Sequence, residues 1–195
     1  MGRVEPPRVT PPIELATERL LLRQWRSSDR EILASINADP RVMEFFPSTL
    51  ARNVSDAAVD RWQGEITERG WGLWATEIRG TGRLIGFVGL QIPRVSLPFA
   101  PCVEVGWRLA CSYWGKGYAT EGARGALRVG FARLGLEEIV SFTPVGNRRS
   151  RAVMERLGMQ VAEATFEHPS LPEGSQLREH CLYRLTREGW GGCHQ

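Results

Sequence analysis

The sequence predicts one α+β domain, with helices packed on a mixed β-sheet. Three observations support this prediction. The apolar spacing changes from strand-like to helix-like within residues 20–36. Two apolar segments, 73–78 and 84–92, flank a glycine turn and are typical of a hairpin. A third alternating segment, 103–109, leads through a glycine loop into an amphipathic helix. Hairpins combined with crossover units imply a sheet with both strand directions.

The first elements are a strand at 20–25 and two helices that cover the sheet. Asp29 is a candidate N-cap of the first helix, which Asp39-Pro40 ends. Ser55 is a candidate N-cap of the second helix, in which apolar residues recur at helical spacing until Gly70.

The rest of the chain alternates strands with helices. The hairpin turns at residues 79–82, and residues 93–101 form a loop. The expected elements that follow are a strand at 103–109, a helix from 117 to 134, a strand at 139–143, a helix at 149–157 ended by Gly158, and strands at 159–166 and 178–185.

Composition limits the class of protein. With 42% hydrophobic and 24% charged residues, the chain is an ordinary folded protein. No apolar run reaches the roughly 20 residues of a membrane span, and no secretory signal is visible, so a cytoplasmic location is expected. A net charge of +3 is too small to predict nucleic-acid binding. We expect a flexible arm at 1–12, a single domain at 13–187 and a tail at 188–195.

The cysteines do not predict a metal site or a disulfide framework. Cys102, Cys111, Cys181 and Cys193 are far apart and include no C-x-x-C pair. Reduced thiols are the simpler interpretation. Cys102 and Cys111 also lack a histidine nearby in sequence, so acyl-cysteine chemistry is not expected.

The glycine loop predicts an anion site. The first N–H groups of a helix have no intrahelical partner and lie at the positive end of its dipole. Gly115 and Gly117 remove the side chains that would keep a phosphate away. Lys116 adds a cation and is the only lysine among the 25 basic residues. A diphosphate fits this pattern, although such a loop can also merely turn a strand into a helix.

Two common nucleotide motifs do not match this loop. The Walker motif needs Ser or Thr where Gly117 stands, and a glycine where Ala110 stands. The dinucleotide fingerprint needs a glycine in place of Thr120 and an acid at the end of the next strand. Glu137 and Glu138 lie at the beginning of that strand instead.

Three separated motifs resemble the GNAT acetyltransferases, most closely the RimJ/RimL-like branch. They are Glu104-Val105-Gly106-Trp107-Arg108-Leu109, Trp114-Gly115-Lys116-Gly117-Tyr118-Ala119-Thr120-Glu121, and Asn147-Arg148-Arg149-Ser150 through Leu157-Gly158-Met159. The opening Thr17-Glu18-Arg19-Leu20-Leu21-Leu22-Arg23 is also similar to that branch.

The resemblance, over about residues 13–187, implies the GNAT fold, with a mostly antiparallel seven-stranded sheet and about four flanking helices. It also implies acetyl transfer from acetyl-CoA to a primary amine, without a metal, by a monomer or homodimer. The amides from Gly115 to Ala119 would hold the pyrophosphate, and a free N–H near Val105 or Trp107 would polarise the thioester. The coenzyme-binding residues implied are Trp107, Arg108, Leu109, Gly115, Lys116, Gly117, Tyr118, Ala119, Thr120, Asn147 and Ser150.

Two positions depart from the family pattern. Ser112 replaces a glutamine or arginine before the glycine loop, and Met154 stands where many relatives place a tyrosine acid. Ser150 is the substitute acid suggested by the branch, with water as an alternative. Glu104 is the candidate base, acting through water, although an exposed glutamate in a salt bridge is an equally simple interpretation. His168 is a weaker candidate near the acceptor.

The acceptor is expected to be a protein N-terminal α-amine. An α-amine with a pKa of about 8 loses its proton far more readily than a lysine near 10.4. One alternative is a small amine such as a polyamine or aminoglycoside, held in an acidic pocket that Glu44, Glu167 and Glu173 could form. Another is an acyl-CoA-binding module without turnover. Segments 38–56 and 167–177 are expected to line the acceptor pocket.

Overall fold

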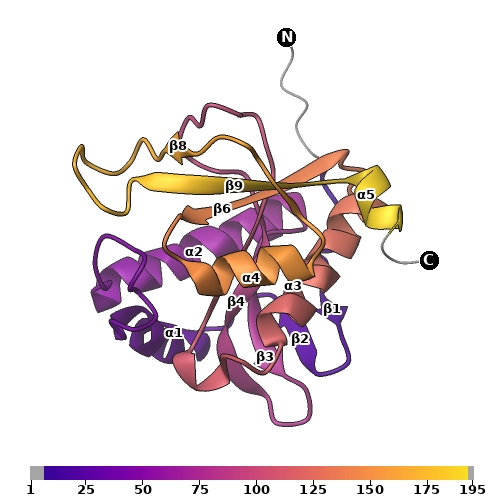
Figure 1. Cartoon of the computed structure of the whole chain (residues 1–195). Coiled ribbons are helices and arrows are strands. Elements are labelled where there is room, and N and C mark those ends of the chain that lie inside the picture. Colours follow the sequence, from indigo (N-terminus) through magenta and orange to yellow (C-terminus); the bar gives the residue numbers. More distant parts are fainter. Residues whose placement is uncertain (1–6, 193–195) are drawn as a thin grey trace.

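The computed structural model describes residues 7–192 and confirms the α+β class (Figure 1). The strands are β1 (Leu15–Ala16), β2 (Leu20–Arg23), β3 (Leu73–Ile78), β4 (Arg83–Gln91), β5 (Glu104–Leu109), β6 (Glu138–Pro144), β7 (Gln160–Val161), β8 (Phe166–Glu167) and β9 (Glu179–Thr186). The helices are α1 (Asp29–Ala38), α2 (Arg52–Arg69), α3 (Tyr118–Arg128), α4 (Arg148–Arg156) and α5 (Arg187–Gly192).

All nine strands of the described chain form one sheet, in the order β1-β2-β3-β4-β5-β6-β9-β7, with β8 beside β9. The predicted seven strands become nine for two reasons. The short β1 pairs with β2, and the strand expected at 159–166 is divided. Val161 pairs with Tyr183, and Phe166 pairs with His180. The chain therefore advances five residues on the β7–β8 side while it advances only three on β9. The extra residues between β7 and β8 leave the ladder.

The sheet opens at its centre. β4 and β5 are antiparallel over six residue pairs, and β6 and β9 over seven. β5 and β6, which are parallel, pair only at Glu104 and Val140. Beyond this point the two strands separate, so one edge of β5 faces a gap inside the sheet.

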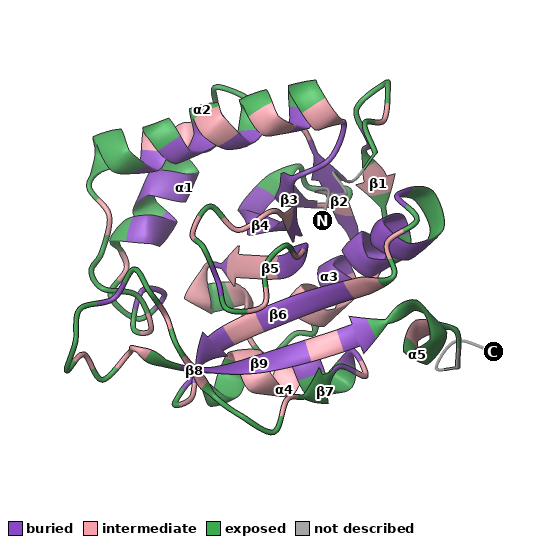
Figure 2. Ribbon diagram, turned by 90° about the horizontal axis from the view of Figure 1, so that it is seen from above, coloured by how far each residue is buried: buried purple, intermediate pink, exposed green. Residues whose placement is uncertain are grey.

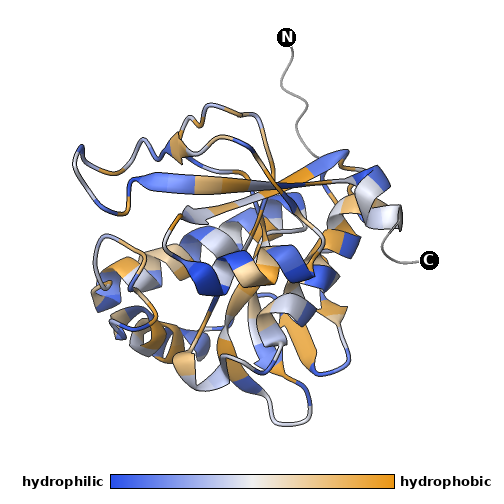
Figure 3. Ribbon diagram, viewed as in Figure 1, coloured by the Kyte–Doolittle hydropathy of each residue, from blue (hydrophilic) through white to orange (hydrophobic). Residues whose placement is uncertain are grey.

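Helices cover both faces of the sheet. Figure 2 shows α1 and α2 on one side and α3 and α4 on the other. The core between them includes the fully buried side chains of Trp71, Trp74 and Leu127. In Figure 3, hydrophilic and hydrophobic segments alternate along the helices, as expected where one face of a helix is buried. No helix within residues 7–192 is long and apolar enough to cross a membrane.

Both predicted N-caps were wrong. Asp29 is the first residue of α1, and its buried carboxylate accepts hydrogen bonds from the Arg23 side chain and from the Arg26 amide. Ser55 lies inside α2, where its Oγ accepts a hydrogen bond from Asn37 Nδ2 at 2.9 Å. In each case a partner from another element replaces the expected local cap. Gly70 ends α2 as predicted, with a φ of 84°.

The ends of several segments differ from expectation. The helix predicted to reach residue 134 continues beyond α3 as a π-helical turn, Val129–Arg133. The predicted tail begins within α5, where Trp190 stacks on Phe131 with ring centroids 5.8 Å apart. Part of the predicted arm is anchored, because Val9 N–H donates to the Arg69 carbonyl at 2.9 Å. Residues 1–6 and 193–195 lie outside the described residues.

A buried ion-pair network ties β2 to α1 and β3. Arg23 donates to Asp29 at 2.7 and 2.9 Å and to Glu77 at 2.7 Å. The Arg23 side chain is only 3% exposed. Removal of the guanidinium would leave Asp29 without a cation, and Glu77 would keep only its longer contact with Arg26, at 3.4 Å.

We therefore expect Arg23→Leu to lower the free energy of unfolding by about 3–5 kcal/mol, because the buried Asp29 carboxylate loses its cation and Glu77 loses the nearer of its two. Urea denaturation followed by circular dichroism measures the change. Arg8→Ala, which removes an exposed pair with Glu68, is the control and should have no measurable effect. Equal stability of Arg23→Leu and the parent would contradict the prediction.

Candidate functional site

The glycine loop and the start of α3 have the geometry of an anion site. Gly115 and Gly117 have φ values of 73° and 81°, a region that other residues rarely adopt. No side chain caps the N-terminus of α3. A Cβ atom added to Gly115 would have no neighbour within 4 Å, so a ligand could approach the loop closely. The backbone amides at the start of α3 are therefore available to an anion.

Glu121 fastens this loop to the β1–β2 turn. Its Oε1 accepts hydrogen bonds from Thr17 Oγ1 at 2.6 Å and Arg19 N at 2.7 Å, and its Oε2 accepts one from Arg19 Nε at 2.6 Å. Arg19 also donates to the Lys116 carbonyl and lies over the Tyr118 ring, 4.7 Å from its centroid. Two segments about a hundred residues apart in the sequence thus hold the loop in shape.

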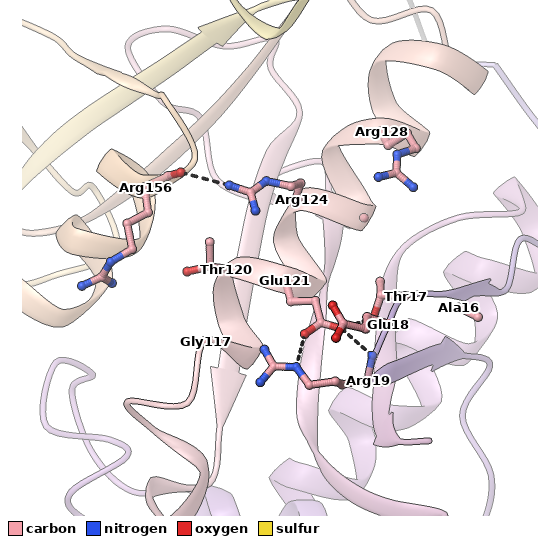
Figure 4. Close-up of a pocket in the computed structure, with 11 residues that line it drawn as sticks. Ala16, Thr17, Glu18, Arg19, Gly117, Thr120, Glu121, Arg124, Arg128 and Arg156 are labelled. Atoms are coloured by element: carbon pink, nitrogen blue, oxygen red, sulfur yellow. Dashed lines mark hydrogen bonds and ion pairs between the residues drawn. The ribbon is translucent and has the colours of Figure 1, made fainter. Parts of the chain in front are cut away.

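A pocket of about 590 Å³ adjoins the loop and is rich in arginine. Figure 4 shows Arg124 reaching from α3 toward α4, where it donates to the Arg156 carbonyl at 3.3 Å. Arg19 and Arg128 also line this pocket. The Arg124 Nε atom is buried and has no hydrogen-bond partner among the described residues. Positive charge therefore gathers next to the free helix N-terminus.

A larger cavity of about 880 Å³ occupies the gap in the sheet. It extends from the glycine loop to the α1–α2 loop, α4 and the segment before β9. The predicted residues that line it are Glu104, Trp107, Arg108, Leu109, Gly115, Gly117, Tyr118, Ala119, Thr120, Asn147 and Ser150. Lys116 does not line it; its Nζ lies 5.5 Å from the Tyr113 ring centroid.

Every second residue of β5 points its backbone N–H and C=O groups into the gap. Ala110 N–H donates to the Ile85 carbonyl on β4. Because pairing alternates along an antiparallel strand, the backbone N–H and C=O groups of Glu104, Gly106 and Arg108 also point toward β4. The N–H and C=O groups of Val105 and Trp107 point the other way. Ser141 Oγ donates to the Val105 carbonyl at 2.9 Å. Trp107, beyond the single β5–β6 pair, has its amide directed into the cavity.

Glu104 is buried on the cavity wall. Its Oε2 accepts a hydrogen bond from Gln91 Nε2 at 2.7 Å, and within residues 7–192 it forms no ion pair. The interpretation of Glu104 as an exposed glutamate in a salt bridge is therefore wrong. Burial raises the pKa of Glu104 from 4.5 to about 7, and the Gln91 hydrogen bond only partly opposes this effect. Such a carboxylate can accept a proton near neutral pH.

Asn147 organises the start of α4. Its Oδ1 accepts a hydrogen bond from Ser150 N at 3.2 Å, as an N-cap does. Its Nδ2 donates to Thr143 Oγ1 at 2.9 Å and to Ser150 Oγ at 3.1 Å. Because Ser150 Oγ accepts this bond, its own hydrogen remains available for a group in the cavity. Met154, 1% exposed, is an apolar part of the same wall.

Two histidines line the other side of the cavity. His168 and His180 have ring centroids 4.9 Å apart and lie against Phe142 and Phe166. Burial lowers the pKa of His168, and it lowers the pKa of His180 to about 4. Both rings are therefore neutral at pH 7. His180 was not predicted as a site residue; the strand at 178–185 also holds Arg178, Glu179 and Arg184, so a polar residue there gave no distinct signal.

The two segments expected to line the acceptor pocket both contribute residues to this cavity, but their carboxylates lie elsewhere. Residues 42, 45–47, 168, 170 and 171 line the cavity. Glu44 pairs instead with Arg149, and Glu167 pairs with Arg178 at 2.9 Å. Neither they nor Glu173 line it, so the predicted acidic pocket does not form. Glu104 is the only carboxylate among the described residues of the wall.

Comparison with known proteins identifies the family. Residues 19–160, more than half of the 195, match the acetyltransferase (GNAT) domain. The chain belongs to the GNAT acetyltransferases. It is 31% identical to FsC-acetyl coenzyme A-N(2)-transacetylase of Aspergillus fumigatus, over 90% of this chain and 77% of that protein. The uncharacterized N-acetyltransferase YnaD of Bacillus subtilis is 25% identical, over 91% and 99%.

Solved structures of GNAT proteins have the same fold. A GNAT-family acetyltransferase from Bacillus anthracis superposes with a TM-score of 0.73 and 24% identity, covering 90% of this chain and 99% of that one. An acetyltransferase from Agrobacterium tumefaciens gives a TM-score of 0.71 and 28% identity, with 94% and 99% covered. This GNAT protein is thus an acetyl-CoA-dependent acyltransferase, and acetyl-CoA is its acyl donor.

The anchoring of the glycine loop gives a test. Glu121→Ala removes the three hydrogen bonds that hold the loop, and we expect the KM for acetyl-CoA to rise about tenfold. Steady-state kinetics at saturating acceptor measures this change. Glu68→Ala, at an exposed position of α2, is the control. An unchanged KM in Glu121→Ala would show that the loop keeps its shape without this carboxylate.

Proposed function

We propose that this enzyme acetylates the α-amine of a peptide or a related small acceptor, by direct attack of the amine on acetyl-CoA in a ternary complex. The observation that carries the proposal is the buried Glu104 carboxylate on the cavity wall, whose pKa of about 7 matches an α-amine. The family gives the reaction class, and the properties of this carboxylate favour one class of amine.

The match can be expressed as free energy. Proton transfer from an α-ammonium with a pKa of about 8 to a base of pKa 7 costs about 1.4 kcal/mol. Transfer from a lysine-like ammonium near 10.4 costs about 5 kcal/mol. The cavity wall offers no second carboxylate within the described residues that would hold a polycation. Both facts favour an α-amine over a polyamine.

The other residues of the cavity have complementary roles in this proposal. The amides from Gly115 to Ala119 hold the pyrophosphate, while the Trp107 amide polarises the thioester carbonyl. Glu104, through water, takes the proton of the attacking amine. As the carbon–sulfur bond breaks, Ser150 donates a hydrogen bond to the departing thiolate, which is protonated from this hydroxyl or from water. No covalent acyl-enzyme is formed.

The relatives support an amine acceptor and leave two classes to compare. The Aspergillus protein is named for transfer to an N(2) nitrogen, which is compatible with an α-amine. The similarity of the sequence motifs to RimJ/RimL-like enzymes favours a peptide N-terminus. A binding module without turnover is the opposing hypothesis, and the ionisable base inside the cavity argues against it.

An acceptor panel tests the proposal. N-terminal peptides beginning with Ser, Ala or Thr should be acetylated, with kcat/KM at least about tenfold above that for putrescine or an aminoglycoside at pH 7. Thiol release and mass spectrometry measure the reaction, with an N-terminally blocked peptide as the control. Acetylation of only the small polycations would reject an α-amine acceptor. Tight acetyl-CoA binding without thiol release for any amine would favour the binding module.

The pKa of Glu104 predicts the pH dependence. The base is active only when ionised, so kcat should rise with pH and level off above about 7. His180, with a pKa of about 4, cannot supply this transition. Glu104→Gln should lower kcat about 100-fold or more and abolish the rise. A variant that keeps the same pH profile would exclude Glu104 as the base.

Glu104→Gln should lower kcat but raise the stability of the folded protein. In the folded protein Glu104 keeps a proton that the unfolded chain releases above pH 4.5, so native stability falls as the pH rises from 4.5 to 7. The neutral Glu104→Gln side chain avoids this loss. Thermal melts should therefore show an advantage for Glu104→Gln that grows between pH 5 and pH 8, which also verifies that the inactive variant is folded.

A further inference from the structure

Arg108 is a cation on the wall of the larger cavity without an anionic partner. Its Nη1 donates to Asn37 Oδ1 at 2.8 Å, and its guanidinium carbon lies 4.1 Å from the Phe46 ring centroid and 5.4 Å from that of Phe87. Its Nε is buried and has no hydrogen-bond partner among the described residues. No Asp or Glu within residues 7–192 forms an ion pair with Arg108. A buried N–H donor that forms no hydrogen bond destabilises the folded protein, unless a ligand accepts that bond.

The surroundings hold the guanidinium in one position. Asn37 is fully buried and is itself fixed by a hydrogen bond to Ser55 Oγ at 2.9 Å. Arg149, another arginine of the cavity wall, already has Glu44 as a partner. Burial lowers the pKa of Arg108 to about 10, since no nearby anion offsets the loss of hydration. The Arg108 guanidinium is therefore already held in position, and it lacks an anionic partner.

Arg108 lies on the acceptor side of the sheet. It shares a face of β5 with Glu104 and with its cross-strand neighbour Phe87, whose ring is tilted against Trp62 of α2 with centroids 4.6 Å apart. The opposite face, with Trp107 beside Val88, packs against α3 and the glycine loop. The Arg108 side chain, which the family resemblance assigned to the coenzyme, is therefore on the face away from the loop.

The floor between Arg108 and Glu104 is open. The two residues are four positions apart, about 13 Å between Cα atoms in an extended strand. Gly106 lies between them on the same face, and a Cβ atom there would have only Glu104 Oε1 within 4 Å, at 3.8 Å. An acceptor can therefore lie along β5 with its amine near the carboxylate and another group near the guanidinium.

We propose that Arg108 binds a carboxylate of the acceptor, so that the enzyme selects α-amines carrying a negative charge several bonds from the reacting nitrogen. This inference rests on the proposed function and adds the charge of the acceptor to it. The guanidinium lies near two aromatic rings and its Nε has no hydrogen-bond partner among the described residues, so a carboxylate that reaches it would gain charge-assisted hydrogen bonds.

Matched dipeptide amides test the charge preference. Ala-Glu-NH2 and Ala-Gln-NH2 have nearly the same shape and the same α-amine, and only the first carries a carboxylate. We expect the parent enzyme to prefer Ala-Glu-NH2 by about tenfold or more in kcat/KM. In Arg108→Gln the ratio should fall to about one, chiefly through loss of activity on the acidic peptide. Arg108→Lys, which keeps the charge without the fork, should retain part of the preference.

Controls separate the possible outcomes. Arg41→Gln, an exposed arginine of the α1–α2 loop that does not line the cavity, should keep the parental ratio. Thermal melts and the KM for acetyl-CoA show whether each Arg108 variant is folded and binds its donor. Equal rates on both peptides in the parent, or a preference that survives in Arg108→Gln, would overturn the role of Arg108 alone. Failure of the parent to acetylate any α-amine would overturn the proposed function as well.

Discussion

The separation of β5 from β6 is the constraint on which the site depends. A parallel pair held at one position, Glu104 with Val140, leaves the following backbone of β5 without a neighbouring strand. Inside a sheet such polar groups would normally be paired, so a ligand or water must complete them. The antiparallel ladders on either side keep the two halves rigid. The gap follows from this pairing pattern, and residues of the glycine loop and of α4 line the same cavity within it.

The two faces of β5 present different residues to that cavity. Trp107 lies on the side of α3, whose uncapped N-terminus favours phosphate. Glu104 and Arg108 lie on the side of α1 and α2, where burial shifts the pKa values of both groups toward neutrality. In the proposed function, donor and acceptor therefore reach one gap from opposite faces. We infer an acceptor with both an amine and a carboxylate, because Glu104 and Arg108 do not pair with each other and the wall between them is open.

Local sequence patterns predicted most elements and failed where tertiary partners intervened. The hairpin, the glycine loop, β5 and the end of α2 follow from periodicity and from glycine geometry, which depend on neighbouring residues. Asp29 and Ser55 resembled N-caps, yet their side chains bond with Arg23 and Asn37, which no local rule could indicate. The divided strand before β9 likewise depends on how two chain segments align.

The sequence by itself determined the family and predicted the anion site, because both depend on contiguous motifs whose backbone geometry is local. Of the residues that the resemblance assigned to the site, all but Lys116 line the larger cavity. Only the tertiary structure decided how these residues are set. The burial that raises the pKa of Glu104, the partner of Glu44 and the unpaired Nε of Arg108 all depend on side chains brought together from distant segments. Solvation and pairing are properties of the folded surroundings and cannot be read from spacing along the chain.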